Sequence, residues 1–65
     1  MIVRPKRYVL YTISTFLGDA KCYIDCFPQQ RWDCRIDGDM ATISRKGVAI
    51  TLPKEEIDKR WAVVD

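Results

Sequence analysis

Apolar and polar residues alternate along most of this 65-residue chain, and glycine or proline interrupts the alternation at intervals. A period of two is typical of strands that bury one face. The pattern predicts strands at residues 6–17, 21–27, 31–36, 39–44 and 48–52, with a short last strand at 61–64. Because turns separate these strands, we expect a mainly β fold, an antiparallel meander of five to six strands that curls into a small SH3-like barrel.

Three dipeptides set the expected strand register, because each suits a two-residue hairpin turn. They are Gly18-Asp19, Asp37-Gly38 and Lys46-Gly47. Turns centred there place apolar residues opposite one another on neighbouring strands. The expected pairs are Ile13 with Ile24, Cys34 with Ala41, Trp32 with Ile43, and Ile43 with Ile50. The three hairpins together therefore predict one continuous apolar face.

The C-terminal segment changes to a helical pattern after Pro53, a residue that can occupy the first turn of a helix. Residues 54–60 place acidic side chains early and basic side chains late, which suits the helix dipole. Ile57 and Trp61 are four positions apart and are expected to pack together on the sheet. One short helix near the C-terminus is thus predicted.

Composition limits what the chain can be. Its length allows one domain, residues 1–65, whose core is too small to enclose a deep active site. The apolar content of 48% and charged content of 31% are typical of a folded globular protein. The net charge of +2 is too balanced to indicate a nucleic-acid binder unless charge is sorted onto one face.

Residues that carry catalysis are missing or isolated. The chain has no histidine, the commonest acid–base and metal-binding side chain. No serine lies in a Gly-x-Ser-x-Gly elbow, and the three glycines are all accounted for by turns. We therefore expect a protein that is not an enzyme and that holds no metal and no cofactor.

Three cysteines, Cys22, Cys26 and Cys34, indicate a reducing compartment, because secreted disulfide scaffolds usually have an even number. We expect buried free thiols and a cytoplasmic protein. Cys22 and Cys26 lie about 13 Å apart on one strand at ~3.3 Å per residue, too far to share a zinc ion or a disulfide. A five-residue loop at 28–32 instead places Cys26 opposite Cys34 and Asp25 opposite Arg35. A three-residue loop would juxtapose two aspartates, which is unfavourable.

The N-terminal region also loosely resembles a signal peptide, with basic residues before the apolar run at 8–17 and a small-residue segment after it. Thr12, Ser14 and Thr15 interrupt that run, and it alternates like a strand. The run is also too short to span a bilayer as a helix. We therefore interpret this region as part of the folded domain.

The second face of the first hairpin is the most informative surface. It carries aromatic and aliphatic residues although the first face already supplies the core, so it needs cover of its own. That cover is either internal, from the helix and Trp61, or external, from a second copy or a different partner. Arg31 and Arg35 are expected to project beside Tyr23 from the neighbouring strand. The predicted partner-binding residues are Tyr8, Leu10, Phe16, Tyr23, Phe27, Arg31 and Arg35.

Aromatic residues mixed with arginine are enriched at protein–protein hot spots. The sequence therefore predicts a non-catalytic protein-binding module, a small inhibitor or adaptor of the size that phages and mobile elements encode. Its partner is another protein or a second copy of the chain. The alternative is a small-barrel nucleic-acid-binding protein that stacks bases on the same aromatic residues.

Overall fold

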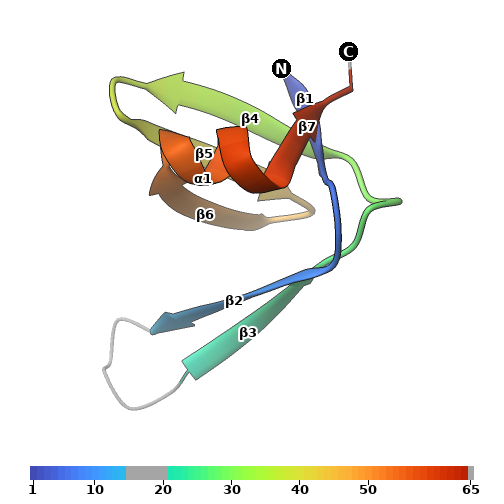
Figure 1. The fold of residues 1–65 in the computed structure, drawn as a ribbon. Helices are drawn as coiled ribbons and strands as arrows, with labels where there is room; N and C mark the ends of the chain where they lie inside the picture. The colour runs from blue at the N-terminus through green and yellow to red at the C-terminus, as the bar shows by residue number, and fades with distance from the viewer. Residues whose placement is uncertain (15–20, 65) are drawn as a thin grey trace.

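The computed structural model describes residues 1–14 and 21–64. Within these ranges the chain is mainly β, with antiparallel pairing and one short helix, as the sequence predicts (Figure 1). The elements are β1 (Ile2–Pro5), β2 (Val9–Ser14), β3 (Lys21–Cys26), β4 (Trp32–Asp37), β5 (Met40–Arg45), β6 (Val48–Pro53), α1 (Lys54–Arg60) and β7 (Trp61–Val63). No helix in the described ranges is long and apolar enough to cross a bilayer.

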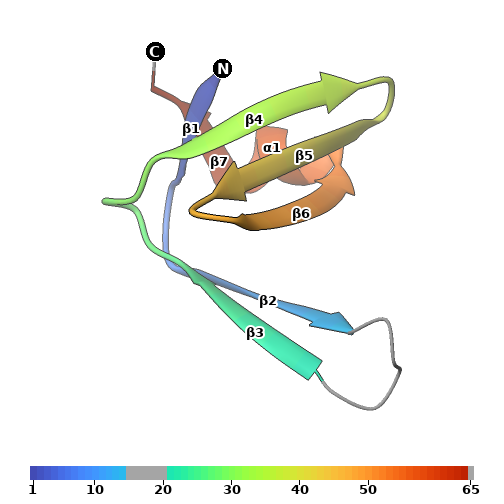
Figure 2. The same ribbon diagram turned by 180° about the vertical axis from the view of Figure 1, so that it is seen from behind.

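The strands form two sheets rather than one meander. A five-stranded sheet has the order β6-β5-β4-β1-β7, and β2 and β3 form a separate two-stranded hairpin. Figure 2 shows this hairpin projecting below the larger sheet as an arm. Among the described residues the two sheets share no strand and no closed barrel forms, so the predicted SH3-like barrel is not confirmed.

The N-terminal strand β1 is the reason that the meander prediction is wrong. Its residue Val3 lies opposite Trp32 of β4 on one side and Val63 of β7 on the other. β1 therefore occupies the edge of β4 that the prediction gave to β3. Val3 is fully buried, so its burial stabilises this arrangement. The strand predicted at 6–17 begins later than expected, because β2 begins at Val9, and β1 at residues 2–5 is an additional strand that the pattern did not predict.

The turn between β5 and β6 has the predicted register. Ile43 lies opposite Ile50 and Ala41 opposite Leu52. Lys46 and Gly47 have φ of 48° and 82°, and two positive φ values define a type I′ hairpin. The Lys46-Gly47 prediction is confirmed.

The other two registers differ from the prediction by two residues. Between β4 and β5 the turn residues are Gly38 and Asp39, so that Cys34 lies opposite Ile43 rather than Ala41. Gly38 has φ of 60° and comes first in the turn, as in a type II′ hairpin. A shift of two residues leaves each side chain on the same face of its strand. The predicted core residues are therefore correct although the predicted register is wrong.

The first hairpin is shifted in the same way. Ile13 lies opposite Cys22, and Ile24 opposite Tyr11. The predicted Gly18-Asp19 turn lies outside the described residues. Here too the apolar face of each strand is the predicted one.

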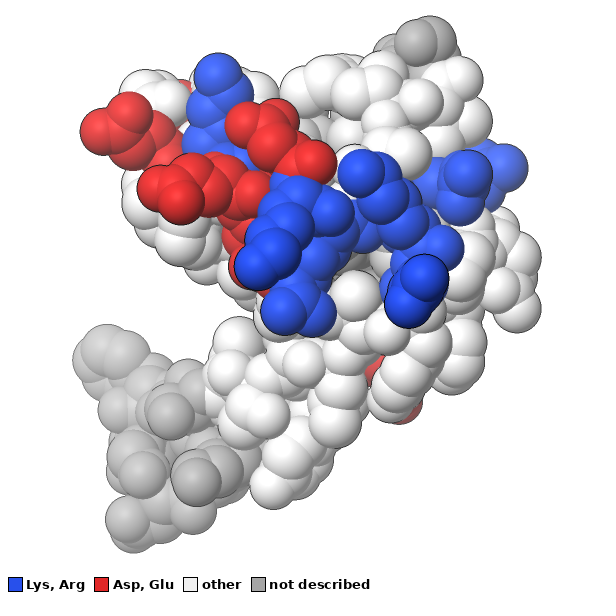
Figure 3. Space-filling model, viewed as in Figure 1, with Lys and Arg blue, Asp and Glu red and all other residues white. Residues whose placement is uncertain are grey.

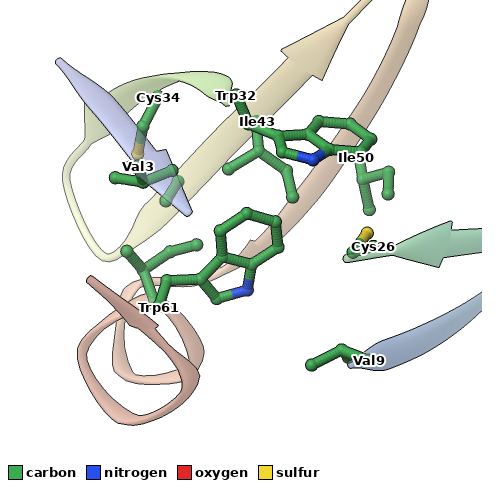
Figure 4. Close-up of a cluster of buried hydrophobic side chains, with 10 residues drawn as sticks. Val3, Val9, Cys26, Trp32, Cys34, Ile43, Ile50 and Trp61 are labelled. Atoms are coloured by element: carbon green, nitrogen blue, oxygen red, sulfur yellow. The ribbon is translucent and has the colours of Figure 1, made fainter. Parts of the chain in front are cut away.

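One core joins both sheets and the helix, and Figure 4 shows its centre. Trp32 and Trp61 meet edge to face, with ring centroids 6.0 Å apart and an interplanar angle of 85°. Ile57 of α1 is also buried, so the predicted packing of Ile57 and Trp61 onto the sheet is confirmed. The buried apolar residues are Val3, Val9, Cys26, Trp32, Cys34, Ala41, Ile43, Ile50, Ile57 and Trp61.

The cysteines all have free thiols. Cys26 and Cys34 are buried, but β3 and β4 are not paired, so the predicted cross-strand contact of these residues is wrong. Cys26 pairs with Val9 across the hairpin, and Figure 4 shows Cys26 and Cys34 well apart, on either side of the two tryptophan rings. Cys22 is exposed rather than buried. Burial raises the pKa of the Cys26 thiol to about 11.

Candidate interaction site

The hairpin of β2 and β3 has two unequal faces because side chains alternate along each strand. Its inner face covers one side of the core. Val9 and Cys26 are buried there, and Tyr11, Ile13 and Ile24 pack against the core while partly exposed. The same alternation turns the opposite side chains to solvent.

The hairpin outer face consists of Tyr8, Leu10, Tyr23 and Phe27. Their exposed fractions are 50%, 48%, 64% and 39% in that order, so none of the elements in the described part of the chain covers them. The rings of Tyr8 and Phe27 lie against each other, with centroids 5.1 Å apart. Large apolar side chains thus remain in water along the whole described arm.

Asp25 lies among these residues on the same face, where it pairs across the strands with Leu10 near the base of the arm. The Tyr8 hydroxyl donates a hydrogen bond to an Asp25 carboxylate oxygen. This hydrogen bond is the main cause of a raised pKa at Tyr8. The face therefore combines apolar area with one negative charge.

A chain of polar contacts fastens the hairpin to the larger sheet and helix. The Trp61 indole Nε1 donates to the Tyr11 hydroxyl at 3.0 Å. That hydroxyl in turn donates to Glu56 Oε1 at 3.3 Å. Arg60 Nε forms an ion pair with the same Glu56 oxygen at 2.9 Å. Tyr11 is thus the polar link between the arm and the body of the protein.

The structure brings together only part of the predicted site. Tyr8, Leu10, Tyr23 and Phe27 share the hairpin outer face, while Phe16 lies outside the described residues. Because β4 pairs with β1 and β5, it does not place Arg31 and Arg35 beside Tyr23.

The two arginines lie elsewhere. Arg31 lies in the connection between β3 and β4, where its guanidinium donates to the carbonyl oxygens of Pro28 and Gln30 at 3.3 and 3.4 Å. Arg35 lines a hollow on the larger sheet with Asp33, Thr42 and other β4–β6 residues.

A second surface, the basic cleft, was not anticipated. It is a hollow of about 230 Å³ lined by Lys6, Arg7, Tyr8, Val9, Lys59 and Arg60. The Lys6 backbone N–H donates to the Arg60 carbonyl at 2.8 Å, which holds the segment between β1 and β2 against the end of α1. Figure 3 shows Lys and Arg gathered there, with Asp and Glu gathered over the start of α1.

Sequence reasoning missed the basic cleft because its two halves are far apart in the chain. The late basic residues of the helix were assigned to the helix dipole, and they do occupy its last turn. The available signal was a basic pair at each end of the chain, at 6–7 and at 59–60. Only the pairing of β1 with β7 brings these pairs together.

Within residues 1–14 and 21–64 no group of three or more His, Cys, Asp or Glu side chains is placed to hold a metal ion. Comparison with family models, with curated proteins and with solved structures gives no match. Function is therefore indicated by the chemistry of the hairpin outer face and of the basic cleft.

Proposed function

We propose that this protein is a non-catalytic protein-binding module that presents the hairpin outer face to another protein. The observation that carries the proposal is the exposure of Tyr8, Leu10, Tyr23 and Phe27 on one side of a projecting arm. Contiguous exposed apolar area is typical of interaction sites, and tyrosine is enriched among the residues that dominate binding energy. A small module of this kind acts as an inhibitor or adaptor, as encoded by phages and mobile elements.

A different protein fits this face better than a second copy does. A two-fold interface centred on the apolar cluster of Tyr8, Leu10 and Phe27 would bring Asp25 close to its own symmetry mate, because Asp25 lies opposite Leu10 and is hydrogen-bonded to Tyr8. Burying two like charges together is unfavourable. A partner that places an arginine or lysine against Asp25 avoids that cost. We therefore propose a heterologous partner with an apolar surface and one basic residue.

The free thiols support a reducing location, and we propose the cytoplasm. Cys22 is exposed and unpaired, and an exposed thiol is readily oxidised in an oxidising compartment. This placement is the same as the one that the odd number of cysteines indicates.

The test compares capture of proteins from the source cells by three forms of the chain. The first is wild type, and the second is Leu10→Ser/Tyr23→Ser, which removes apolar area from the arm without touching the core. The control is Met40→Ser/Val63→Ser, because both residues are also exposed, at 41% and 59%, but lie on the larger sheet. We expect one partner to be retained by wild type and control and lost from the arm variant, as truncated hot-spot residues each cost about 2 kcal/mol or more.

The purified partner should then bind wild type and the Met40→Ser/Val63→Ser control with similar affinity, and the arm variant more weakly. Equal binding to the arm variant and to wild type would contradict the proposal. A concentration-dependent dimer that the arm variant abolishes would assign the face to a second copy instead.

A further inference from the structure

Among the described residues, the lining of the basic cleft carries four cations and no acidic side chain. Lys6, Arg7, Lys59 and Arg60 converge on it from two segments, whereas three of the carboxylates line a hollow at the other end of α1. The acidic side chains of that hollow are Asp39, Glu55 and Asp58. Although the net charge is only +2, positive side chains gather at one end of α1 and negative side chains at the other. Like charges held together attract an anionic ligand and are stabilised by it.

Arg60 is already held in position for such a ligand. Its Nε is paired with Glu56 at 2.9 Å, and its side chain is 52% exposed. Two guanidinium nitrogens therefore stay available for an anion, and the ion pair reduces the entropy lost when they bind one.

Tyr8 adds an exposed aromatic ring to the cations of the cleft. It lines the cleft, is half exposed and packs its ring against Phe27. Its hydroxyl is engaged by Asp25, which leaves the ring itself as the group that Tyr8 offers. Cations that follow a backbone beside exposed aromatic rings are the combination that single-stranded nucleic acids require.

We propose that the basic cleft binds the backbone phosphates of a single-stranded nucleic acid, with a base stacked on the ring of Tyr8. The hollow of about 230 Å³ admits a phosphate and its neighbouring sugar rather than a duplex. This site differs from the one that the sequence indicated, since Lys6, Arg7, Lys59 and Arg60 take the place of Arg31 and Arg35. The cleft shares Tyr8 with the hairpin outer face, but its four cations lie outside that face, so variants at Leu10 and Tyr23 separate the two proposals.

The test is fluorescence anisotropy with a labelled oligothymidylate of about twelve nucleotides, over about 50–300 mM salt. We expect wild type to bind, with a slope of log affinity against log salt near −2.8 if all four cations meet phosphates, at ~0.7 per single-strand contact. Lys6→Ala/Arg7→Ala and Lys59→Ala/Arg60→Ala are each expected to reduce affinity tenfold or more and the slope by about 1.4.

The matched control is Arg35→Ala/Lys54→Ala, which removes the same charge from residues that do not line the cleft. We expect its affinity to stay within about threefold of wild type. Tyr8→Leu is expected to lose about fivefold or more, with the slope unchanged, because stacking is not an ionic contact. Leu10→Ser/Tyr23→Ser should bind the oligonucleotide like wild type, which separates this proposal from the protein-binding one.

Four results would overturn the proposal. One is no binding by wild type at the lowest salt, and another is an equal loss in the control and the cleft variants. The third is displacement of the oligonucleotide by poly-glutamate at equal charge concentration, which would assign the cleft to an acidic protein segment. Equally tight binding of a duplex would also contradict the single-strand assignment. The thermal unfolding midpoint of each variant is measured as well, to show that the variant is folded and that its lower affinity is not caused by unfolding.

Discussion

Replacing Tyr11 by Phe removes one hydroxyl group from the link between the arm and the body. The ring stays in place against the core, so the change isolates the polar contacts. Trp61, which donates its indole N–H to that hydroxyl at 3.0 Å, is only 3% exposed. Without its acceptor, this buried N–H is left unsatisfied, which costs about 1–3 kcal/mol.

The second contact adds less. The Tyr11 hydroxyl lies 3.3 Å from Glu56, a long hydrogen bond, and Glu56 keeps its ion pair with Arg60. We therefore expect Tyr11→Phe to lower the free energy of unfolding by about 1–3 kcal/mol. A 65-residue domain has about 3–10 kcal/mol in total at 0.05–0.15 kcal/mol per residue, so the loss is a substantial fraction.

The assay is urea unfolding followed by tryptophan fluorescence, with the thermal midpoint as a second readout. Each kcal/mol corresponds to about 4–8 °C for a domain of this size. Tyr23→Phe is the matched control, because Tyr23 is 64% exposed on the outer face of the same hairpin. We expect the control to stay within ~0.5 kcal/mol of wild type. An equal effect of the two substitutions would refute the role of Tyr11 as the link.

Two further predictions concern the thiols and alkaline pH. A thiol reagent at about pH 8 should modify exposed Cys22 at once and the buried Cys26 and Cys34 only as the protein unfolds; rapid modification of all three would contradict their burial. Burial raises the pKa of Cys26 from 9.0 to about 11, and burial also raises the pKa of Tyr11. The folded state thus keeps protons that the unfolded chain releases, so stability is full below pH 9 and declines towards pH 11. Urea midpoints at about pH 8 and pH 10.5 measure the decline, and Cys26→Ala should reduce it.

The faces of the strands could be predicted from the sequence even where the register could not. Ile43 is buried as expected, although it lies opposite Cys34 rather than Trp32. A hairpin shifted by two residues returns every side chain to the same side, so the alternation fixes the face while the turn fixes the register. The chain adopts a turn in which Gly38 comes first, as in type II′. The sequence alone favours a turn centred on Asp37-Gly38, in which glycine comes second.

The division into two sheets could not be predicted from local pattern. β1 has four residues and ends in Pro5, too short a run for its alternation to stand out. Its position depends on contacts with β4 and β7, which come from distant parts of the chain. The same long-range pairing creates the basic cleft, so neither feature has a local signal.

The candidate arm residues were predictable for a simpler reason. Tyr8, Leu10, Tyr23 and Phe27 are apolar residues on the side of the hairpin that does not supply the core. The alternation of residues shows that this second face is also apolar, and this holds whichever strand lies next to the hairpin. Arg31 and Arg35 were placed beside it only by assuming that β4 pairs with β3.

The most direct test of the arm as the binding surface is photo-crosslinking in the source cells. A benzoylphenylalanine side chain takes the place of Tyr23 in one form of the protein and of Val63 in another. Both positions are well exposed, at 64% and 59%, so both can react with whatever is near. We predict a discrete higher-mass adduct from the Tyr23 position and none from the Val63 position. Adducts from neither position, or the same adducts from both, would contradict the assignment of the hairpin outer face as the binding surface.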